Sequence, residues 1–493
     1  MRILSTIKLF SAILSAAIVF PLAAVSPEYD ETLYAALQRE GMARAMLLAD
    51  AIEAKPENPT SALYLLKTVN LSANELKQFA VRYEEIWKKH PANAAIALHG
   101  SVIFDKAQMP AKKTLSMLKL AGRYYNPDPD NEIAHTVNTI RLAMHLKCGD
   151  NEDAEKFAST LDQSKIYYRQ VYFYHTLSYR AAVAGDMKKS AQLKELCLKA
   201  IRKESEKAFP ETKYSALTQL MAEAADKNCP DYAEAIYQHV LQNCENEVIV
   251  KNFKAIYCSK LKNYEKAEKI MAGLDFNGSV KTTVLFQSAL LAGNWNAALT
   301  HISRSPRSAR KDMLISLAAR KYDGKLLKLA GDDKEFPAER RALYKLYAAG
   351  LLKDVKLFRE AEELCKNRRL TVSEMNSFAY TACELGIDLA KSEKTLRKVV
   401  SAEPDNAAYL DSLAYACYRR GLYAEAQNYI EEALRKIDLE TPASVILEHA
   451  GDIARAQGNL YQAQKYYQRA LDMGKGDFSF DPRSAEKKLK ELK

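Results

Sequence analysis

The chain has 493 residues and a formal net charge of +10. It contains 17 glycines and 15 prolines, and this glycine content is about half of what average usage would give. Sheet proteins need turn residues roughly every dozen positions, whereas the helix formers Ala, Leu, Lys and Glu dominate here. The composition therefore predicts an all-α protein and disfavours β-sandwiches and barrels.

The N-terminus has the three-part layout of a secretory signal peptide. Arg2 and Lys8 form a short basic start, and 9–19 is apolar apart from two serines. Pro21 then interrupts the apolar run, and Ala24 offers a small residue for cleavage. We predict a signal peptide over 1–24. The alternative is an uncleaved anchor, but the run is short for a bilayer span of about 20 residues.

Removal of the signal peptide would leave a soluble, exported chain that begins near Val25. No cysteine precedes Cys148, which excludes a lipid-modified N-terminal cysteine. We therefore expect a periplasmic or cell-envelope protein that is not a lipoprotein. The eight cysteines are irregularly spaced and include no Cys-x-x-Cys pair. Free structural thiols are expected, and a disulfide framework is the alternative.

The C-terminal part contains an internal repeat. When Gly421 is aligned with Gly458, the segments 407–434 and 444–471 match at an offset of 37 residues. Small residues coincide along the alignment, in the pairs Ala414 and Gly451, Ala426 and Ala463, and Ala433 and Ala470. Such spacing predicts a helical hairpin in which a first helix ends at the glycine and a second returns antiparallel. Small side chains allow the two backbones to approach closely.

These positions resemble the tetratricopeptide repeat (TPR). A third copy precedes them at 373–400, with Ser392 in place of the usual alanine and Ile387 in place of the usual glycine. Weaker signals continue upstream, where Ser178 and Ser190 fit another copy. An aromatic residue with an alanine three residues later also recurs, at Tyr232/Ala235, Tyr264/Ala267, Trp295/Ala298 and Phe358/Ala361.

The resemblance implies an α-solenoid of stacked antiparallel hairpins with a right-handed superhelix. We expect a divergent TPR-like region over 27–370 and clear repeats over 371–475. A capping helix is predicted in 476–493, where Ala485, Leu489 and Leu492 share one face. This helix would cover the last apolar surface of the array.

No motif for catalysis, a cofactor or a metal ion stands out. The eight histidines form no zinc-protease pair, and no nucleophile elbow or phosphate-binding glycine loop occurs. We interpret Glu448-His449 as an exposed or half-packed helical pair. The chain is therefore predicted not to be an enzyme. An activity hidden in the divergent region and a self-associating architectural role remain alternatives.

The segment 303–311 carries four basic residues and is predicted to be a loop between repeats. Behind a signal peptide, its functional interpretation is contact with an anionic envelope surface. The alternative is a solvated loop. No nucleic-acid partner is expected.

The TPR resemblance implies a concave groove lined by the first helix of each hairpin. The matching residues of the last two repeats are Asp411, Tyr415, Tyr418, Arg419, Glu448, Asp452 and Arg455. Aromatic rings beside charged groups suit an extended or helical peptide. We therefore predict a protein-interaction scaffold or adaptor and expect these side chains to be exposed. Ordinary solvated positions would look the same in sequence.

Overall fold

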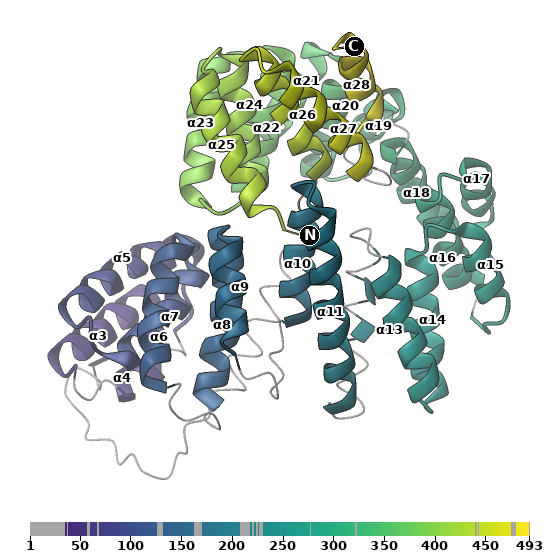
Figure 1. The fold of residues 1–493 in the computed structure, drawn as a ribbon. Coiled ribbons are helices and arrows are strands. Elements are labelled where there is room, and N and C mark those ends of the chain that lie inside the picture. The colour runs from purple at the N-terminus through teal and green to yellow at the C-terminus, as the bar shows by residue number, and fades with distance from the viewer. Residues whose placement is uncertain are drawn as a thin grey trace. The chain divides into compact units, whose positions relative to one another are not determined.

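The computed structural model describes the chain from residue 35 to residue 492. Gaps lie at 37, 57–59, 67–68, 126–131, 162–169, 208–216, 219–220, 223–224, 226–229, 277, 321–322, 439–440, 442 and 475–479. The predicted signal peptide over 1–24 lies outside the described residues. All regular secondary structure in the described part is helical, which confirms the all-α prediction (Figure 1).

The chain divides into two compact units. The first comprises Met1–Phe173 and Glu403–Asp405. The second comprises Tyr174–Ala402 and Asn406–Lys493. The expected change from divergent to clear repeats near residue 370 therefore lies within the second unit.

The first unit consists of helices that pack against their neighbours in the sequence. They are α3 (Gly41–Ala54), α4 (Thr60–Leu66), α5 (Ala73–Lys89), α6 (Ala94–Lys106), α7 (Ala111–Tyr125), α8 (Glu132–Cys148) and α9 (Asn151–Ser159). A capping box begins α5, where the Ser72 hydroxyl accepts from the backbone N–H of Glu75 and the Glu75 carboxylate accepts from that of Ser72. The Tyr83 ring of α5 is fully buried, and its hydroxyl donates to the Ile96 carbonyl of α6 at 3.1 Å.

The boundary between the units falls inside α10 (Gln170–Val183), and a row of helices follows. They are α11 (Met187–Lys207), α13 (Pro230–Asn243), α14 (Glu247–Lys260), α15 (Tyr264–Ala272), α16 (Gly278–Leu291), α17 (Trp295–Arg304), α18 (Arg307–Arg320) and α19 (Gly324–Asp332). Ser178 and Ser190 are both buried, and the Ser178 hydroxyl donates to the Ser190 carbonyl at 3.0 Å. This contact confirms the hairpin that the two serines predicted.

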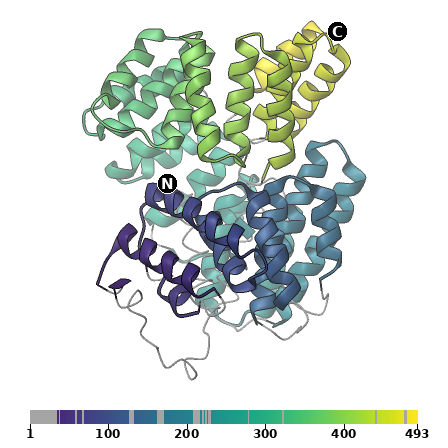
Figure 2. The ribbon, with the colours of Figure 1, turned by 90° about the vertical axis from the view of Figure 1, so that its left-hand side faces the viewer.

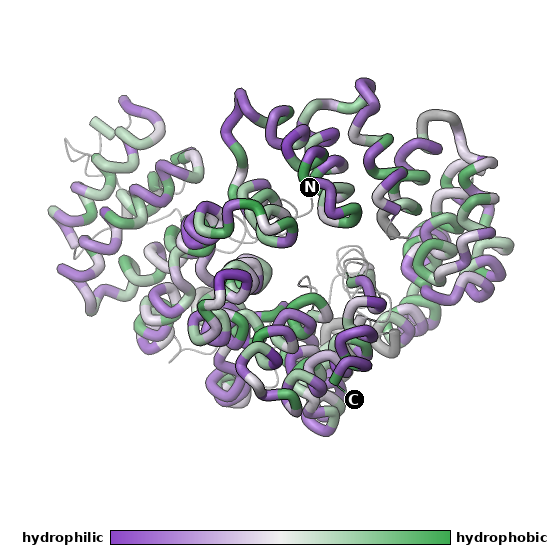
Figure 3. The backbone as a smooth tube through the Cα atoms, turned by 90° about the horizontal axis from the view of Figure 1, so that it is seen from above, coloured by the Kyte–Doolittle hydropathy of each residue, from purple (hydrophilic) through white to green (hydrophobic). Residues whose placement is uncertain are grey.

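The C-terminal array completes the second unit. Its helices are α20 (Ala338–Leu352), α21 (Val355–Cys365), α22 (Val372–Leu385), α23 (Leu389–Ala402), α24 (Ala407–Arg419), α25 (Tyr423–Lys436), α26 (Ala443–Ala456), α27 (Leu460–Met473) and α28 (Pro482–Glu491). In Figure 2 the green-to-yellow helices of this array lie side by side. The alternation of hydrophobic and hydrophilic residues along individual helices is visible in Figure 3, as amphipathic helices require.

First helices of the array end in the same backbone turn. Lys353, Gly386, Gly421 and Gly458 have φ values of 53°, 72°, 76° and 82°. In each case the next backbone N–H bonds to the carbonyl five residues earlier, for example Leu422 to Cys417 at 2.9 Å. This is the Schellman ending, which favours glycine because other residues strain at positive φ. These turns provide a structural register for aligning the repeats.

The hairpin interfaces confirm the small-residue pattern of the last two repeats. Ala414, Ala426 and Ala463 are fully buried. A β-carbon built on Gly451 would lie 2.4 Å from the Tyr467 ring. Only a residue without a side chain therefore fits between α26 and α27 in this arrangement.

The preceding repeat requires a correction of one residue. Gly386, rather than Ile387, adopts the left-handed turn at the end of α22. Asp388 also has a positive φ of 37°, and its carboxylate caps the following helix at Lys391. One extra residue thus separates the turn from buried Ser392, which shifts α22 relative to the sequence alignment.

The C-terminal helix covers the end of the array as predicted. Ala485 and Leu489 of α28 are buried, and Leu492 packs partly buried against the cluster that contains Leu489. Phe480, just before the helix, is 2 % exposed and joins the main core of the array.

The structure of the basic stretch differs from its prediction. The stretch 303–311 is not a loop, because only Ser305 and Pro306 separate α17 from α18. Arg310 donates to the carbonyls of Ser305 and Ser303, each at 2.8 Å. This arginine is therefore already bonded within the chain, which weakens the expectation that it contacts an anionic surface.

Free thiols are found at buried cysteines that include Cys258, Cys365, Cys383 and Cys417. Among the described helices, none is long and apolar enough to cross a membrane.

Candidate partner-binding face

The Schellman turns place tyrosines at equivalent positions of three successive hairpins. Tyr347, Tyr380 and Tyr415 each lie six residues before the left-handed residue of their helix. Asp452 occupies the same position in α26. Tyr418 lies one turn beyond Tyr415, with ring centroids 6.0 Å apart. We call Tyr347, Tyr380, Tyr415 and Tyr418 the tyrosine stripe.

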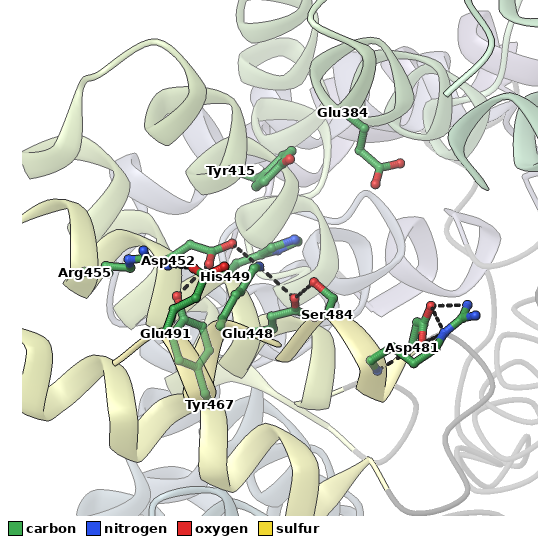
Figure 4. A network of polar contacts seen from close by, with 12 residues as sticks. Glu384, Tyr415, Glu448, His449, Asp452, Arg455, Tyr467, Asp481, Ser484 and Glu491 are labelled. Carbon is green, nitrogen blue, oxygen red and sulfur yellow. Dashed lines mark hydrogen bonds and ion pairs between the residues drawn. The ribbon is translucent and has the colours of Figure 1, made fainter. Parts of the chain in front are cut away.

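A buried polar cluster lies beneath the stripe. His449 of α26 is 6 % exposed, and Asp411 of α24 is 5 % exposed. The Nδ1 atom of His449 lies 2.8 Å from the Asp411 carboxylate, and its Nε2 atom lies 3.2 Å from the Tyr380 hydroxyl. The His449 ring stacks on Tyr415 with centroids 4.5 Å apart (Figure 4). The cluster thus joins the first helices of three repeats.

The charges around His449 favour its protonated form. Burial by itself would lower the pKa of His449. The adjacent Asp411 carboxylate outweighs burial, with help from Asp452 and Glu448, so that the pKa lies above its ordinary value. The expectation of an exposed or half-packed His449 is therefore wrong, because a carboxylate on the neighbouring repeat stabilises it in the core. Asp411 is likewise buried rather than exposed.

Arg419 is half-buried and connects two repeats. Its Nη1 atom donates to the carbonyls of Cys383 and Glu384 at the end of α22, the latter at 3.2 Å. It also donates to the Tyr415 hydroxyl at 3.2 Å. The expectation that Tyr415 and Arg419 are freely exposed is wrong. The last carbonyls of α22 need donors, which Arg419 provides, and the Tyr415 ring is covered by the His449 ring.

The predicted residues of the last repeat are in contact with the chain's own C-terminal helix. Lys488 of α28 lies 2.7 Å from each of the carboxylates of Glu448 and Asp452. Asp452 also accepts from the Tyr467 hydroxyl at 2.7 Å. Of the three residues, Arg455 alone is exposed, and it pairs with Glu491 of α28 at 2.9 Å (Figure 4).

The surface that remains accessible lies further toward α20. The side chain of Tyr347 is 67 % exposed, and nearby Leu351 on the same helix is 40 % exposed. Tyr380, Tyr415 and Tyr418 are each half-buried. Tyr347 and Tyr380 were not among the predicted site residues, because the alignment through Ile387 placed Tyr380 at a packing position. Alignment on Gly386 would have found Tyr380.

Other possible sites do not coincide with this face. An open depression of about 410 Å³ lies on α28 and is lined by Arg483, Glu486, Lys487, Lys490 and Glu491. Its walls come from one exposed helix, so we do not treat it as a binding site. Within the described part of the chain, no group of His, Cys, Asp and Glu is arranged to hold a metal ion.

Comparison with known proteins supports a TPR-like chain. No family model matches the sequence. Over 85 residues, the chain is 42 % identical to a TPR repeat-containing protein of Pseudomonas aeruginosa. The match covers 17 % of this chain and 14 % of that relative, so the chain spans only a small part of the relative's length. This match, the Schellman turns and the small-residue interfaces together show a TPR-like repeat protein.

Three solved structures have a distant likeness to the chain. The pentatricopeptide repeat protein PPR10, solved with an 18-nucleotide RNA, has a TM-score of 0.33 and 12 % identity, with 92 % of this chain and 80 % of that one covered. The Cut9–Hcn1 structure of the APC/C gives 0.30 and 13 %, with 85 % and 82 % covered. A TPR protein from Parabacteroides merdae gives 0.24 and 16 %, with 67 % and 99 % covered.

Likenesses this distant identify no partner for the chain. PPR10 is bound to RNA in its structure, and the expectation that this chain has no nucleic-acid partner stays a prediction. The names of the Pseudomonas aeruginosa and Parabacteroides merdae proteins describe TPR proteins and name no enzymatic activity. They leave enzymatic activity untested.

Proposed function

We propose that the chain is an exported scaffold that binds a segment of a partner protein along the tyrosine stripe. The observation that carries this proposal is the recurrence of tyrosine at one position of three successive hairpins. The first of these tyrosines, Tyr347, is 67 % exposed. Aromatic residues are enriched among the residues that dominate binding energy at protein interfaces. A TPR-like array is a suitable frame because repeats present the same position again and again along one surface.

The chemistry of the stripe favours apolar anchors in the partner. The hydroxyl of Tyr415 accepts from Arg419, and that of Tyr380 contacts His449. These hydroxyls are therefore already engaged, whereas the ring surfaces remain partly accessible. Large, rigid rings provide contact area at a low cost in side-chain entropy. We expect the bound segment to present apolar side chains spaced to meet successive rings.

The exported location is a separate part of the proposal. It is supported by the basic, apolar and small-residue segments at 1–24. The mature protein should begin at or near Val25. Mass spectrometry of the protein isolated from the envelope fraction tests this, and an intact Met1 there would contradict cleavage.

Site-specific photo-crosslinking tests the binding face. A photoreactive phenylalanine analogue is placed at Tyr347 in one protein and at Tyr461 in another. Tyr461 is a matched control because it is also 67 % exposed but lies on α27, the second helix of its hairpin. Crosslinked proteins should be recovered from cells with the probe at Tyr347 and not with the probe at Tyr461.

Affinity measurements with the crosslinked partner complete the test. The double change Tyr347→Ala plus Tyr418→Ala should weaken binding by about thirtyfold, since it removes two ring anchors. Tyr461→Ala should leave binding unchanged. Equal loss from both proteins, or crosslinking at Tyr461 alone, would reject the stripe as the binding face. Crosslinks to other copies of this chain would instead favour the architectural role.

A further inference from the structure

Two of the buried histidines of the second unit differ in their partners. His449 and His301 are 6 % and 5 % exposed. His301 contacts the Tyr264 hydroxyl at 2.8 Å, whereas His449 contacts both Tyr380 and the Asp411 carboxylate. The His449 cluster therefore contains a carboxylate that can hold a proton on the ring. His301 provides an internal reference in which burial dominates.

The groups that face His449 come from several helices. Helix α24 contributes Asp411 and Tyr415, and α22 contributes the Tyr380 hydroxyl. Helix α26 contributes the carboxylates of Glu448 and Asp452. Both of these pair with the one ammonium group of Lys488 of α28, which compensates one of their two negative charges. Among the described residues, no ion pair links the Asp411 carboxylate to a cation other than His449, so the His449 ring is its main counter-charge.

Both protonation states of His449 can keep their hydrogen bonds. In the doubly protonated ring, Nδ1–H donates to Asp411 and Nε2–H donates to the Tyr380 oxygen. In the neutral ring, Nδ1–H still donates to Asp411, and Nε2 accepts from the Tyr380 hydroxyl. Rotation of one hydroxyl hydrogen is enough to exchange the two patterns. The change that remains is electrostatic, because the neutral ring leaves the Asp411 charge buried without its cation.

We propose that the proton on His449 is a switch that tightens the junction of α22, α24 and α26 when bound and loosens it when released. The switch itself requires only the cluster of His449, Asp411 and Tyr380. Since Tyr380 and Tyr415 also belong to the tyrosine stripe, the same proton would regulate partner binding, and that second part rests on the proposed function.

The direction of the effect follows from the pKa. The pKa of His449 is raised above its ordinary value of 6.5 in the folded chain. The stabilisation is therefore complete below about pH 6.5 and is lost as the pH rises through the folded pKa. Between the two pKa values, the equilibrium constant for opening the junction should rise about tenfold per pH unit. His301 behaves in the opposite way, because its pKa is lowered by burial and, to a smaller extent, by the charge of Arg304.

Hydrogen–deuterium exchange on the full chain tests the switch without any partner. Exchange rates of amides in α24 and α26 are converted to protection factors at about pH 6 and about pH 8.5, which removes the intrinsic effect of pH on exchange. Protection should fall at the higher pH in the wild type. His449→Gln should abolish this dependence, and His301→Gln should leave it intact. Equal pH dependence in the wild type and in His449→Gln would overturn the proposal.

Titration of the histidine side chains by NMR gives a second reading. The His449 signal is the one that disappears in His449→Gln, and its midpoint should lie above 6.5. Asp411→Asn should lower this midpoint by at least about one pH unit, since it removes the adjacent charge. A midpoint at or below 6.5, or one unchanged by Asp411→Asn, would also refute the switch. Neither measurement involves a ligand, so failure of the proposed function would leave both results standing.

Discussion

The Arg419 guanidinium donates a hydrogen bond to the Glu384 carbonyl oxygen at 3.2 Å, although the two residues belong to consecutive repeats. Glu384 lies in the last turn of α22, where helix carbonyls lack partners within the helix. Arg419 therefore caps one repeat from the next. A variant that changes Tyr415 and Arg419 together would weaken the array as well as any binding face, so binding tests should use Tyr347 and Tyr418.

Arg419→Ala should lower the free energy of unfolding by about 1–2 kcal/mol, because the charged hydrogen bonds from the guanidinium to the carbonyls of Cys383 and Glu384 are lost. Denaturant unfolding followed by circular dichroism measures the change. Arg435→Ala, at an exposed position on α25, is the control and should have little effect. A stability equal to that of the wild type would show that the guanidinium contributes nothing to the junction.

Gly451→Ala should destabilise the last repeat by about 1–3 kcal/mol, because overpacking displaces a well-packed neighbour. The added β-carbon would lie 2.4 Å from the Tyr467 ring. Gly278→Ala is the matched control, since a β-carbon there meets nothing within 4 Å. Thermal melting should separate the two variants, and identical melting temperatures would contradict the close approach of α26 and α27.

Ala426→Leu and Ala463→Leu should each cost about 1–3 kcal/mol for the same physical reason. Both alanines are fully buried at hairpin interfaces. Ala424→Leu, at an exposed position of α25, should be tolerated. If all three variants melt alike, the assigned interfaces are incorrect.

Lys488→Met should destabilise the C-terminal cap by about 1–3 kcal/mol, because it leaves two poorly solvated carboxylates without their cation. The side chains of Glu448 and Asp452 are 13 % and 11 % exposed. Lys490→Met removes a cation from the exposed side of α28 and should have little effect. Limited proteolysis near the C-terminus can compare them, and equal cleavage rates would argue against the buried ion pairs.

Acid should weaken the first unit through His145. Burial, assisted by the charges of Arg141 and Lys119, lowers the pKa of His145 to about 4. The neutral ring is therefore favoured in the folded state, and its contribution to stability is present above about pH 6.5 and is lost as the pH falls toward 4. Hydrogen exchange in α8 should accelerate over this interval after correction for pH. His145→Phe should remove most of that acid dependence.

The sequence alone was sufficient for the helical class and for the last two hairpins. Helix formers dominate the composition, and small residues at fixed spacing mark where two backbones must touch, as at Ala414 and Ala426. The capping helix was also predictable, because its apolar residues share one face. These features are local or periodic, so neighbouring residues are enough to reveal them.

The tertiary structure decided which polar residues are available. The pairing of His449 with Asp411 spans 38 positions, and that of Lys488 with Glu448 spans 40. No local pattern shows that a carboxylate on one repeat meets a cation on the next. The single extra residue after Gly386 likewise moves Tyr380 into the stripe. Burial and charge pairing depend on how repeats stack in space, and for that reason residues that look exposed on a single helix become part of the core.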